Sequence, residues 1–371
     1  MTLKKWTIFI LGTLLFTVGC ATKQNYSDTN NTGNSASQSP YFEKLVMVDS
    51  LGITGADGVI SFPLSKKESV FMMGDSFLSK VEHGKRDSSS IMINNSFIII
   101  DNKKGIHKAL YNGTPDKPES FLKPANEKEY YWPGDGFKRK GLLHLFMTRF
   151  EHIDEDWGFR FTGTDYIRMA ENDFKVVSVE NFPYSNVNDV HYGHSLLNQS
   201  GYVYIYGSKF DGKVSELHVA RALLDPKEGK LKNYQFFDGS EWVANPSETK
   251  KLKGINKLVP EQFSVFKYGK VYVLLMMDRD FTTGNIYSYT SNSPVGPWGN
   301  EKKLYHTTEQ EQYSEDRLFT YNAMAHPQYI QDDRLLISYC VNSFMVPKIH
   351  EHVEYYRPRF LWVPLQMILG P

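Results

Sequence analysis

The segment Phe263-Ser-Val-Phe-Lys-Tyr-Gly-Lys-Val-Tyr-Val-Leu-Leu275 decides the fold class, because it reads as a β-hairpin that recurs along the chain. It contains an apolar strand, a Gly turn and a second, more apolar strand. Hairpins of the same kind occupy residues 59–74, 136–148, 195–207 and 327–339. Short apolar runs separated by Gly, Asn, Asp and Pro clusters are typical of antiparallel strands. The sequence therefore predicts an all-β fold.

The spacing of the hairpins predicts the architecture. They recur about every 60 to 75 residues, a period that suits four-stranded blades with long loops. Five such units predict a five-bladed β-propeller, in which the apolar second strands pack between neighbouring blades. We expect residues 41–48 to pair with the final strand, residues 359–365, and so close the ring. A pair of irregular β-sandwiches is the alternative architecture.

The N-terminus predicts export and lipidation. Lys4 and Lys5 precede an apolar run, and Gly19-Cys20 follows it, which is the order of a secretory signal. Residues 16–20 resemble the lipobox of bacterial lipoproteins, so residues 1–20 are expected to be a signal peptide ending at a lipid-modified, palmitate-bearing Cys20. A plain signal peptide with an incidental cysteine is the alternative. The anchor predicts a location at the bacterial cell envelope, on the outer membrane or cell surface or in the periplasm.

The rest of the chain divides into a tether and one domain. Residues 21–40 are polar and offer almost nothing to bury, so they predict a flexible tether. Residues 41–371 contain no second linker and predict one propeller domain, which we expect to be a monomer that touches the membrane through its anchor alone. Lys plus Arg (42) balance Asp plus Glu (42), which argues against nucleic acid as a partner. Cys340 lies in an apolar run and is expected to be a buried thiol.

The candidate site consists of residues that directly precede the hairpins, because the inner strands of a propeller start around a common centre. Carboxylates lead three of the five hairpins, as Asp57, Asp135 and Glu261. Asp75 follows the first hairpin and is expected to reach the same rim. The polar and aromatic residues considered beside these acids as substrate-binding groups are Trp132, His194, Gln262, Asn322, His326 and Arg357.

Carboxylates flanked by aromatic side chains predict a sugar site. Acids protonate or attack a glycosidic centre, and aromatic faces stack on sugar rings. We therefore expect Asp57, Asp75, Asp135 and Glu261 to be catalytic. The alternative for Asp57-Gly58 and Asp135-Gly136 is that they simply form turns. Arg357 is expected to pair with a pocket carboxylate or a substrate oxygen, with a structural ion pair as the alternative.

Two other kinds of motif, one like that of an esterase and one of paired histidines, give weaker predictions of function. Gly74-Asp75-Ser76-Phe77 resembles the nucleophile block of Gly-Asp-Ser-Leu esterases, but the chain contains no Asp-x-x-His to supply the base. His191-x-x-His194 and His350-x-His352 lack a convincing third ligand in the sequence, so no metal site is predicted. No cofactor is expected, and nothing in the sequence supports a structural Ca²⁺ ion.

Several motifs together resemble a known family. They are Gly55-Ala-Asp57-Gly, Met73-Gly-Asp75-Ser-Phe, Asn94-Asn-Ser96, Trp132-Pro-Gly-Asp135-Gly, Ser293-Pro-Val-Gly-Pro-Trp298, Tyr321-Asn-Ala-Met-Ala-His326-Pro and Ile337-Ser-Tyr-Cys-Val-Asn342-Ser. Their order is similar to that in a five-bladed propeller family, the domain of unknown function 4185, whose characterised members include bacterial endo-D-arabinanases. The resemblance implies a glycosidase with Asp57 and Asp75 as its leading pair and Asp135 close behind. A Glu often serves as general acid in the wider group, and Glu261 and Glu216 are the candidates.

The sequence leaves two functions open. The first is a glycoside hydrolase acting on a furanose-containing, arabinan-like polysaccharide at the cell envelope. The second is a non-catalytic glycan-binding lipoprotein. Several acids at one rim favour the enzyme, because a binder needs aromatic platforms but not paired carboxylates. The resemblance leads us to expect a small residue where this chain has His194. This larger side chain is expected to affect which sugar the pocket accepts.

Overall fold

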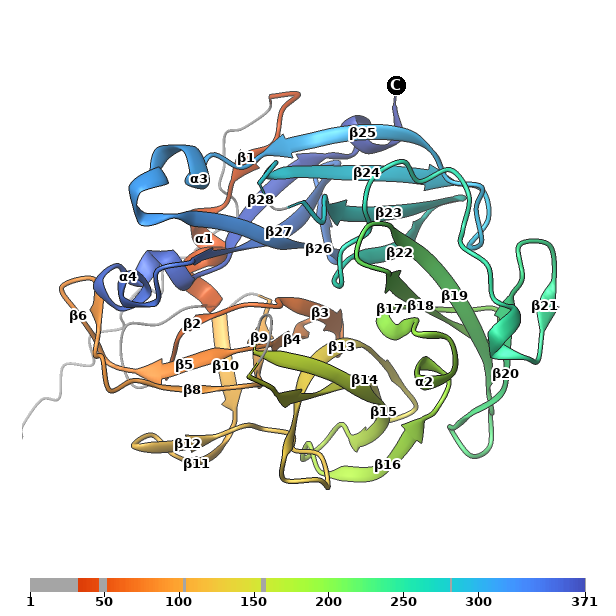
Figure 1. Ribbon diagram of the computed structural model, residues 1–371, viewed down its shortest axis with the longest axis horizontal. Coiled ribbons are helices and arrows are strands. Elements are labelled where there is room, and N and C mark those ends of the chain that lie inside the picture. The colour runs from red at the N-terminus through yellow and green to blue at the C-terminus, as the bar shows by residue number, and fades with distance from the viewer. Residues whose placement is uncertain (1–32, 47–51, 103–104, 155–157, 281, 371) are drawn as a thin grey trace, which may run out of the picture.

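The computed structural model describes residues 33–46, 52–102, 105–154, 158–280 and 282–370 (Figure 1). The predicted signal peptide, Cys20 and most of the predicted tether lie outside the described residues. Among the described residues, no helix combines the length and hydropathy that crossing a bilayer requires.

The fold is mostly antiparallel sheet. It has five main sheets, whose strands are given in order outward from the centre. The first sheet contains β3(Ile60–Pro63), β4(Glu68–Met73), β9(Ser96–Asp101) and β10(Gly105–Leu110), the second β13(Glu129–Arg139), β14(Leu142–His152), β15(Phe159–Ala170) and β16(Val176–Phe182), and the third β17(His191–Gln199), β18(Tyr202–Phe210), β19(Ser215–Leu224), β20(Leu231–Phe237) and β21(Trp242–Val243). The fourth contains β22(Ser264–Tyr268), β23(Val271–Met277), β24(Asn285–Ser291) and β25(Gly299–His306), and the fifth β26(Leu318–Gln331), β27(Arg334–Ser343), β28(Arg359–Pro364) and β1(Ser37–Gln38).

Shorter elements connect or cover these sheets. The strands are β2(Gly52–Ala56), β5(Ser76–Ser79) and β8(Ile91–Ile93), which form one small sheet, and the pairs β6(Val81–Glu82) with β7(Lys85–Arg86) and β11(Asn112–Thr114) with β12(Lys117–Glu119). The helices are α1(Pro40–Val46), α2(Ser185–Asn188), α3(Glu309–Gln312), α4(Val346–Glu351), α5(Leu365–Leu369), η1(Pro246–Glu248), η2(Ser314–Asp316) and η3(Val353–Tyr356).

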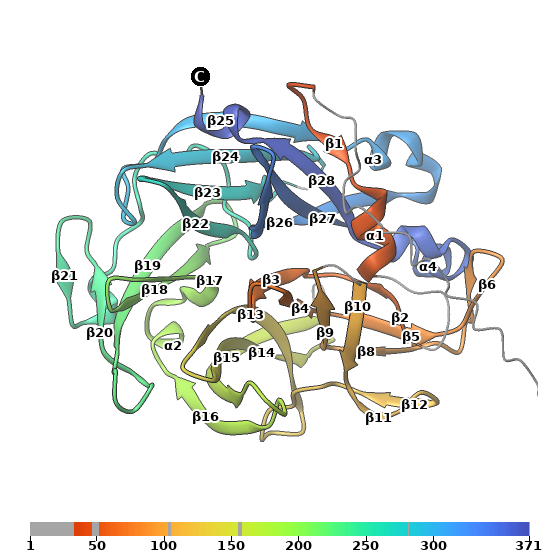
Figure 2. The same ribbon diagram turned by 180° about the vertical axis from the view of Figure 1, so that it is seen from behind.

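The five main sheets surround a common centre (Figures 1 and 2). Strand β3 contacts β13, β13 contacts β17, β17 contacts β22, β22 contacts β26, and β26 returns to β3. The innermost strands thus form a closed circle of contacts, and their starts lie near one another. This arrangement brings together residues that are far apart in the sequence.

All five predicted hairpins are confirmed as the first two strands of the main sheets. The second strands β4, β14, β18, β23 and β27 are largely buried on both faces. Their apolar side chains supply much of the core between neighbouring sheets, as the sequence predicts. Cys340 is buried in β27 and forms no disulfide with any described residue, also as expected.

The closing strand differs from the prediction. Residues 41–46 belong to helix α1, and the strand that pairs with β28 is β1, through Ser37 with Trp362. Pro40 suits the first position of a helix, and Phe42 and Val46 lie one turn apart, so both reach the core. The end of the predicted tether, residues 37–40, is therefore part of the fold.

Candidate active site

Asp57 and Asp75 lie side by side at the start of the first hairpin and at its exit. The Asp57 amide donates to the Asp75 carbonyl (3.2 Å), and the Gly74 amide donates to the Asp57 carbonyl (2.8 Å). A Cβ atom on Gly74 would lie 2.5 Å from Asp57 Oδ1, so only glycine leaves room for this carboxylate. Both aspartates are half-buried. The backbone pairing thus places two carboxylates at one end of the first main sheet.

Residues from other parts of the molecule hold the two carboxylates. The hydroxyls of Tyr321 and Tyr356 donate to Asp57 Oδ2 at 2.8 and 3.1 Å. Asp75 Oδ1 accepts from Trp132 Nε1 (2.8 Å) and Asn94 Nδ2 (3.2 Å). Tyr321 lies on β26 and Trp132 on β13, the innermost strands of the two sheets that flank β3. The pair therefore lies where three sheets meet.

Burial makes both carboxylates weak acids. It raises the pKa of Asp57 to about 6, and the two tyrosine hydroxyls oppose part of that rise. Burial and then the negative charge of Asp57 raise the pKa of Asp75 to about 7, against the hydrogen bonds from Trp132 and Asn94. Two neighbouring carboxylates of this kind resist double ionisation. Near neutral pH, the pair can hold one proton.

Asp135 is held differently, by the backbone. Its Oδ1 accepts from the Gly136 amide and its Oδ2 from the Leu196 amide, both at 2.7 Å. Burial raises the pKa of Asp135 to about 7, and these two hydrogen bonds oppose the rise. The Leu196 contact joins a bulge of β13 to the part of β17 that directly follows its bulge. The structure therefore gives Asp135 a role in positioning two sheets, and no contact joins it to the Asp57 and Asp75 pair.

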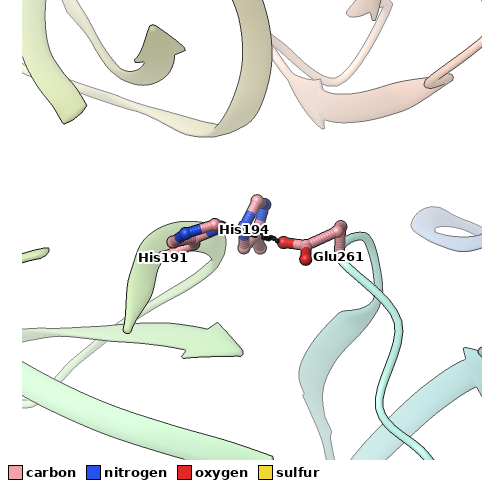
Figure 3. Close-up of side chains that lie close together, drawn as sticks. All are labelled: His191, His194 and Glu261. Carbon is pink, nitrogen blue, oxygen red and sulfur yellow. Dashed lines mark hydrogen bonds and ion pairs between the residues drawn. The ribbon is translucent and has the colours of Figure 1, made fainter. Parts of the chain in front are cut away.

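Glu261 gathers with two histidines (Figure 3). Its Oε2 lies 3.2 Å from His191 Nδ1 and 3.4 Å from His194 Nε2. The histidines come from β17, whereas Glu261 precedes β22 in the next sheet. Arg279 Nη1 donates to Oε1, the other carboxylate oxygen, at 3.0 Å. Of the predicted catalytic acids, Glu261 alone is thus tied to basic groups.

The carboxyl pKa in this cluster shifts in the opposite direction from those of the aspartate pair. Burial raises the pKa of Glu261, but the hydrogen bond from His191, the contact with His194 and the charges of both histidines outweigh it and hold the pKa well below its ordinary value. Burial lowers the pKa of His194, and Glu261 opposes that change. Glu261 is therefore an ionised carboxylate, and it is not suited to be the proton donor that the resemblance implies.

Gln262 links this cluster to the aspartate side of the centre. A Cβ atom on Gly58 would lie 3.2 Å from Gln262 Nε2, so the Gln262 side chain reaches the residue next to Asp57. The oxygen of this amide is buried and has no hydrogen-bond partner among the described residues. Gln262 thus lies beside the residue that follows Asp57, and its amide oxygen accepts no hydrogen bond from a described residue.

Trp132 belongs to a group of aromatic rings beside Asp75. Its ring lies 5.4 Å from that of Tyr130, 4.5 Å from Phe150 and 4.8 Å from Phe159, measured between centroids. Phe159 is 36% exposed although it is a large apolar residue. We call Tyr130, Trp132, Phe150 and Phe159 the aromatic ledge. Tyr130 and Phe150 are buried, so the faces on which a sugar ring could stack are those of Trp132 and Phe159.

Two other candidates, His326 and Arg357, have structural partners. His326 is fully buried, with its ring nitrogens 2.6 Å from Ser61 Oγ and 2.9 Å from Ser338 Oγ, so in this structure its side chain belongs to the core. Arg357 donates to the Thr54 carbonyl and pairs with Glu354, the structural alternative.

Two further candidates have structural partners, and one occupies a bulge. Glu216 pairs with Lys251 at 2.9 Å on β19, outside the inner strands. The Ser76 hydroxyl is buried against Ser96 and the Gly74 carbonyl, which leaves no base for an esterase nucleophile. Asn322 has a φ of 53° at the β26 bulge, next to Tyr321.

The sequence prediction missed several groups that touch the acids. Asn94 and Tyr321 lie inside motifs that carry the family resemblance, so their motifs were the available signal. Tyr356 and Arg279 had no such signal. Their partners lie 299 and 18 residues away in the sequence, and only the folded chain brings them together.

The fold and the site together define a class of protein. It is a ring of antiparallel sheets with two hydrogen-bonded carboxylates where three of the sheets meet. The chain belongs to the family DUF5005, described as a domain of unknown function, whose model matches residues 19–364. The motif resemblance to the domain of unknown function 4185 stays a prediction. A search of curated proteins found no match.

One solved structure shares the fold, and others match at lower scores. A Bacteroides ovatus ATCC 8483 protein, described provisionally as a hydrolase, matches with a TM-score of 0.74 and 16% identity over 90% of this chain and 92% of that chain. An α-L-arabinofuranosidase from Podospora anserina matches at 0.47 and 11% identity, covering 85% and 92% of the two chains. A Cellvibrio cellulosa α-L-arabinanase complexed with arabinohexaose matches at 0.44 and 10%, covering 83% and 91%. The last two scores are low, so neither bears on the function of this chain.

Proposed function

We propose that this chain is a glycoside hydrolase built on a five-bladed β-propeller, acting on a furanose-containing, arabinan-like polysaccharide. The observation that carries the proposal is the pair Asp57 and Asp75, two adjacent half-buried carboxylates whose pKa values burial raises to about 6 and about 7. Glycosidic bonds are cleaved by two carboxyl groups that differ in protonation state. The five main sheets and their closed circle of inner-strand contacts support the five-bladed count.

The hydrogen bonds support different roles for the two aspartates. Two hydroxyls donate to Asp57 Oδ2 and stabilise its ionised form, so Asp57 acts as the base or nucleophile. Both side-chain donors of Asp75 reach Oδ1, which leaves Oδ2 to carry the proton. Asp75 then acts as the general acid and gives this proton to the leaving-group oxygen. The aromatic ledge beside it supplies stacking surface for the sugar.

The cellular setting is part of the proposal. A lipid on Cys20, reached through a polar segment, would hold the domain at the cell envelope while its centre faces polymer. The basic and apolar order of residues 1–20 supports export, and the motif resemblance to endo-D-arabinanases supports the furanose substrate.

A polysaccharide panel tests the proposal. The full chain in detergent is incubated with arabinans, fructans, xylans and mannans, and released reducing ends are measured. We expect cleavage of an arabinan-like polymer, lost about 10³-fold in Asp57→Asn and in Asp75→Asn because each removes a proton-transfer group. Asp116→Asn is the matched control, since Asp116 is an exposed carboxylate far from the pair in the β11–β12 turn.

The aromatic ledge also favours the second candidate, a glycan-binding protein without catalysis. Gel retardation of the same polymers separates the two. If the wild type releases no oligosaccharide but retards a polysaccharide, and both asparagine variants retard it equally, the protein is a binder and the hydrolase proposal fails.

A further inference from the structure

We infer that His191, His194 and Glu261 form a binding site for a divalent transition metal ion, with Zn²⁺ as the best fit. The sequence analysis predicted no metal site, because the His191-x-x-His194 pair lacked a third ligand. The fold supplies that ligand from the next sheet. One donor atom from each of the three residues lies within 4.8 Å of the others.

The distances match the spacing of metal ligands. His191 Nδ1 and His194 Nε2 lie 3.2 and 3.4 Å from Glu261 Oε2. Ligands about 2.0–2.1 Å from a tetrahedral Zn²⁺ ion lie roughly 3.3 Å from one another. The two measured separations are therefore those expected of atoms that share one ion. Ser208 Oγ lies 3.3 Å from the same oxygen and is a further polar group at the site.

His194 gives further evidence, because its buried imidazole has a single long contact, the 3.4 Å ion pair between Nε2 and Glu261 Oε2. The side chain is 5% exposed, and neither ring nitrogen meets the geometry of a hydrogen bond to any described residue. A buried polar atom without a hydrogen bond is destabilising and rare in native proteins. An ion at the centre of the three donors would satisfy Nε2.

The remaining groups orient the ligands. Phe161 stacks on the His191 ring, with centroids 3.7 Å apart and an angle of 22° between the planes. Arg279 donates to Glu261 Oε1 and so leaves Oε2 facing the histidines. Partners that orient ligand side chains in this way are characteristic of metal sites.

The ligand set decides which ion fits. Two imidazoles and one carboxylate suit Zn²⁺ and its neighbours, whereas Ca²⁺ prefers six to eight oxygen ligands. The site is therefore of a different kind from an oxygen-lined calcium site. Three protein ligands leave a fourth position for water or a substrate hydroxyl. The ion would also join β17 to the segment before β22 and so stabilise the contact between two sheets.

Metal binding tests the inference without any activity assay. The full chain, purified without a histidine tag and treated with a chelator, is dialysed against Zn²⁺ and analysed by mass spectrometry for bound metal. We expect one Zn²⁺ per chain, loss of this ion in His191→Ala and in Glu261→Gln, and full binding in a His350→Ala, His352→Ala control. His350 and His352 lie outside the cluster.

Cobalt substitution keeps the inference falsifiable if a variant fails to fold. Wild type loaded with Co²⁺ should show the visible absorption of a four-coordinate ion, and Zn²⁺ should displace it. No Zn²⁺ in the dialysed wild type, equal binding by folded variants, or binding of Ca²⁺ in preference to Zn²⁺ would overturn the inference and leave an ion-pair network. These outcomes are independent of whether Asp57 and Asp75 cleave a polysaccharide.

Discussion

Asp57 and Asp75 receive different donors, although they lie on adjacent backbone segments. Two phenol hydroxyls reach Asp57, and an indole and an amide reach Asp75. Asp75 also experiences the negative charge of Asp57, which raises its pKa further. Such a pair titrates as a unit, with two apparent pKa values. The contacts of these two residues thus predict one ionised and one protonated carboxyl group within a narrow pH range.

Catalytic activity should be highest within that pH range. Cleavage needs Asp57 ionised and Asp75 protonated, so kcat/KM should fall below pH about 6 and again above pH about 7. A pH profile of reducing-end release measures this. A plateau extending from pH 7 to about pH 9 would contradict the assignment of Asp75 as general acid.

Replacing Trp132 with Phe should move the alkaline limb of the profile. The Trp132 indole lowers the pKa of Asp75, so its removal should raise that pKa by about one unit, the size of a hydrogen bond to a charged group. The acidic limb should shift little. Trp242→Phe is the control, since Trp242 lies on the outer strand β21. Equal profiles for wild type and Trp132→Phe would show that the indole does not act on Asp75.

Asp135 should make stability depend on pH. Its pKa rises from about 4 in the unfolded chain to about 7 in the folded chain, so its contribution is complete below pH 4 and is lost as the pH rises to 7. The Tm of the wild type minus the Tm of Asp135→Asn should therefore fall between pH 4 and pH 7, because the asparagine side chain stays neutral. Asp116→Asn should show no such trend. A wild-type Tm that rises relative to that of Asp135→Asn as the pH increases would contradict the burial of this carboxyl group.

The sequence predicted these acids but not their environments. Asp57, Asp75, Asp135 and Glu261 each stand next to a hairpin, and that position is visible in a local pattern. The Leu196 amide that holds Asp135 and the histidines that hold Glu261 come from neighbouring sheets. Contacts of that kind depend on the angle between sheets, which no local pattern encodes. His326 shows the same limit, since its side chain is buried between β3 and β27.

At the scale of elements, the hairpins were predictable because each is a local unit with a turn residue between two apolar strands. Strand β1 was not, because Ser37 and Gln38 have no strand pattern and pair with residues over 300 positions away. Phe42 and Val46 fit a helix better than a strand, since buried residues four apart share a helix face.

Strand β1 yields a stability prediction. The Ser39 amide donates to the Phe360 carbonyl, and Arg334 donates to the Gly33 and Ser35 carbonyls. A chain that begins at Tyr41 loses these bonds and the β1 pairing, and at about 1 kcal/mol each we expect a loss of roughly 2–4 kcal/mol in the free energy of unfolding. Urea unfolding measures it, with a chain that begins at Gly33 as the control. Equal stability of the two chains would show that β1 does not hold the last sheet.

At the scale of the molecule, the circle of inner strands gathers two different groups of ionisable residues. The aspartate pair has pKa values raised by burial, while the Glu261 cluster keeps its carboxylate ionised between two histidines. Gln262 reaches from one group to the other. The proposed proton donor and the proposed metal site thus lie in neighbouring parts of the same ring of inner strands.

The central claim is that Asp57 and Asp75 act as one catalytic pair. The most direct test compares the rate of reducing-end release by the wild type, Asp57→Asn, Asp75→Asn and the double variant on the polymer that the wild type cleaves best. Residues that act as a unit are not additive, so each single variant should lose about 10³-fold and the double variant hardly more. Single variants that retain the wild-type rate, or losses that multiply in the double variant, would contradict the claim.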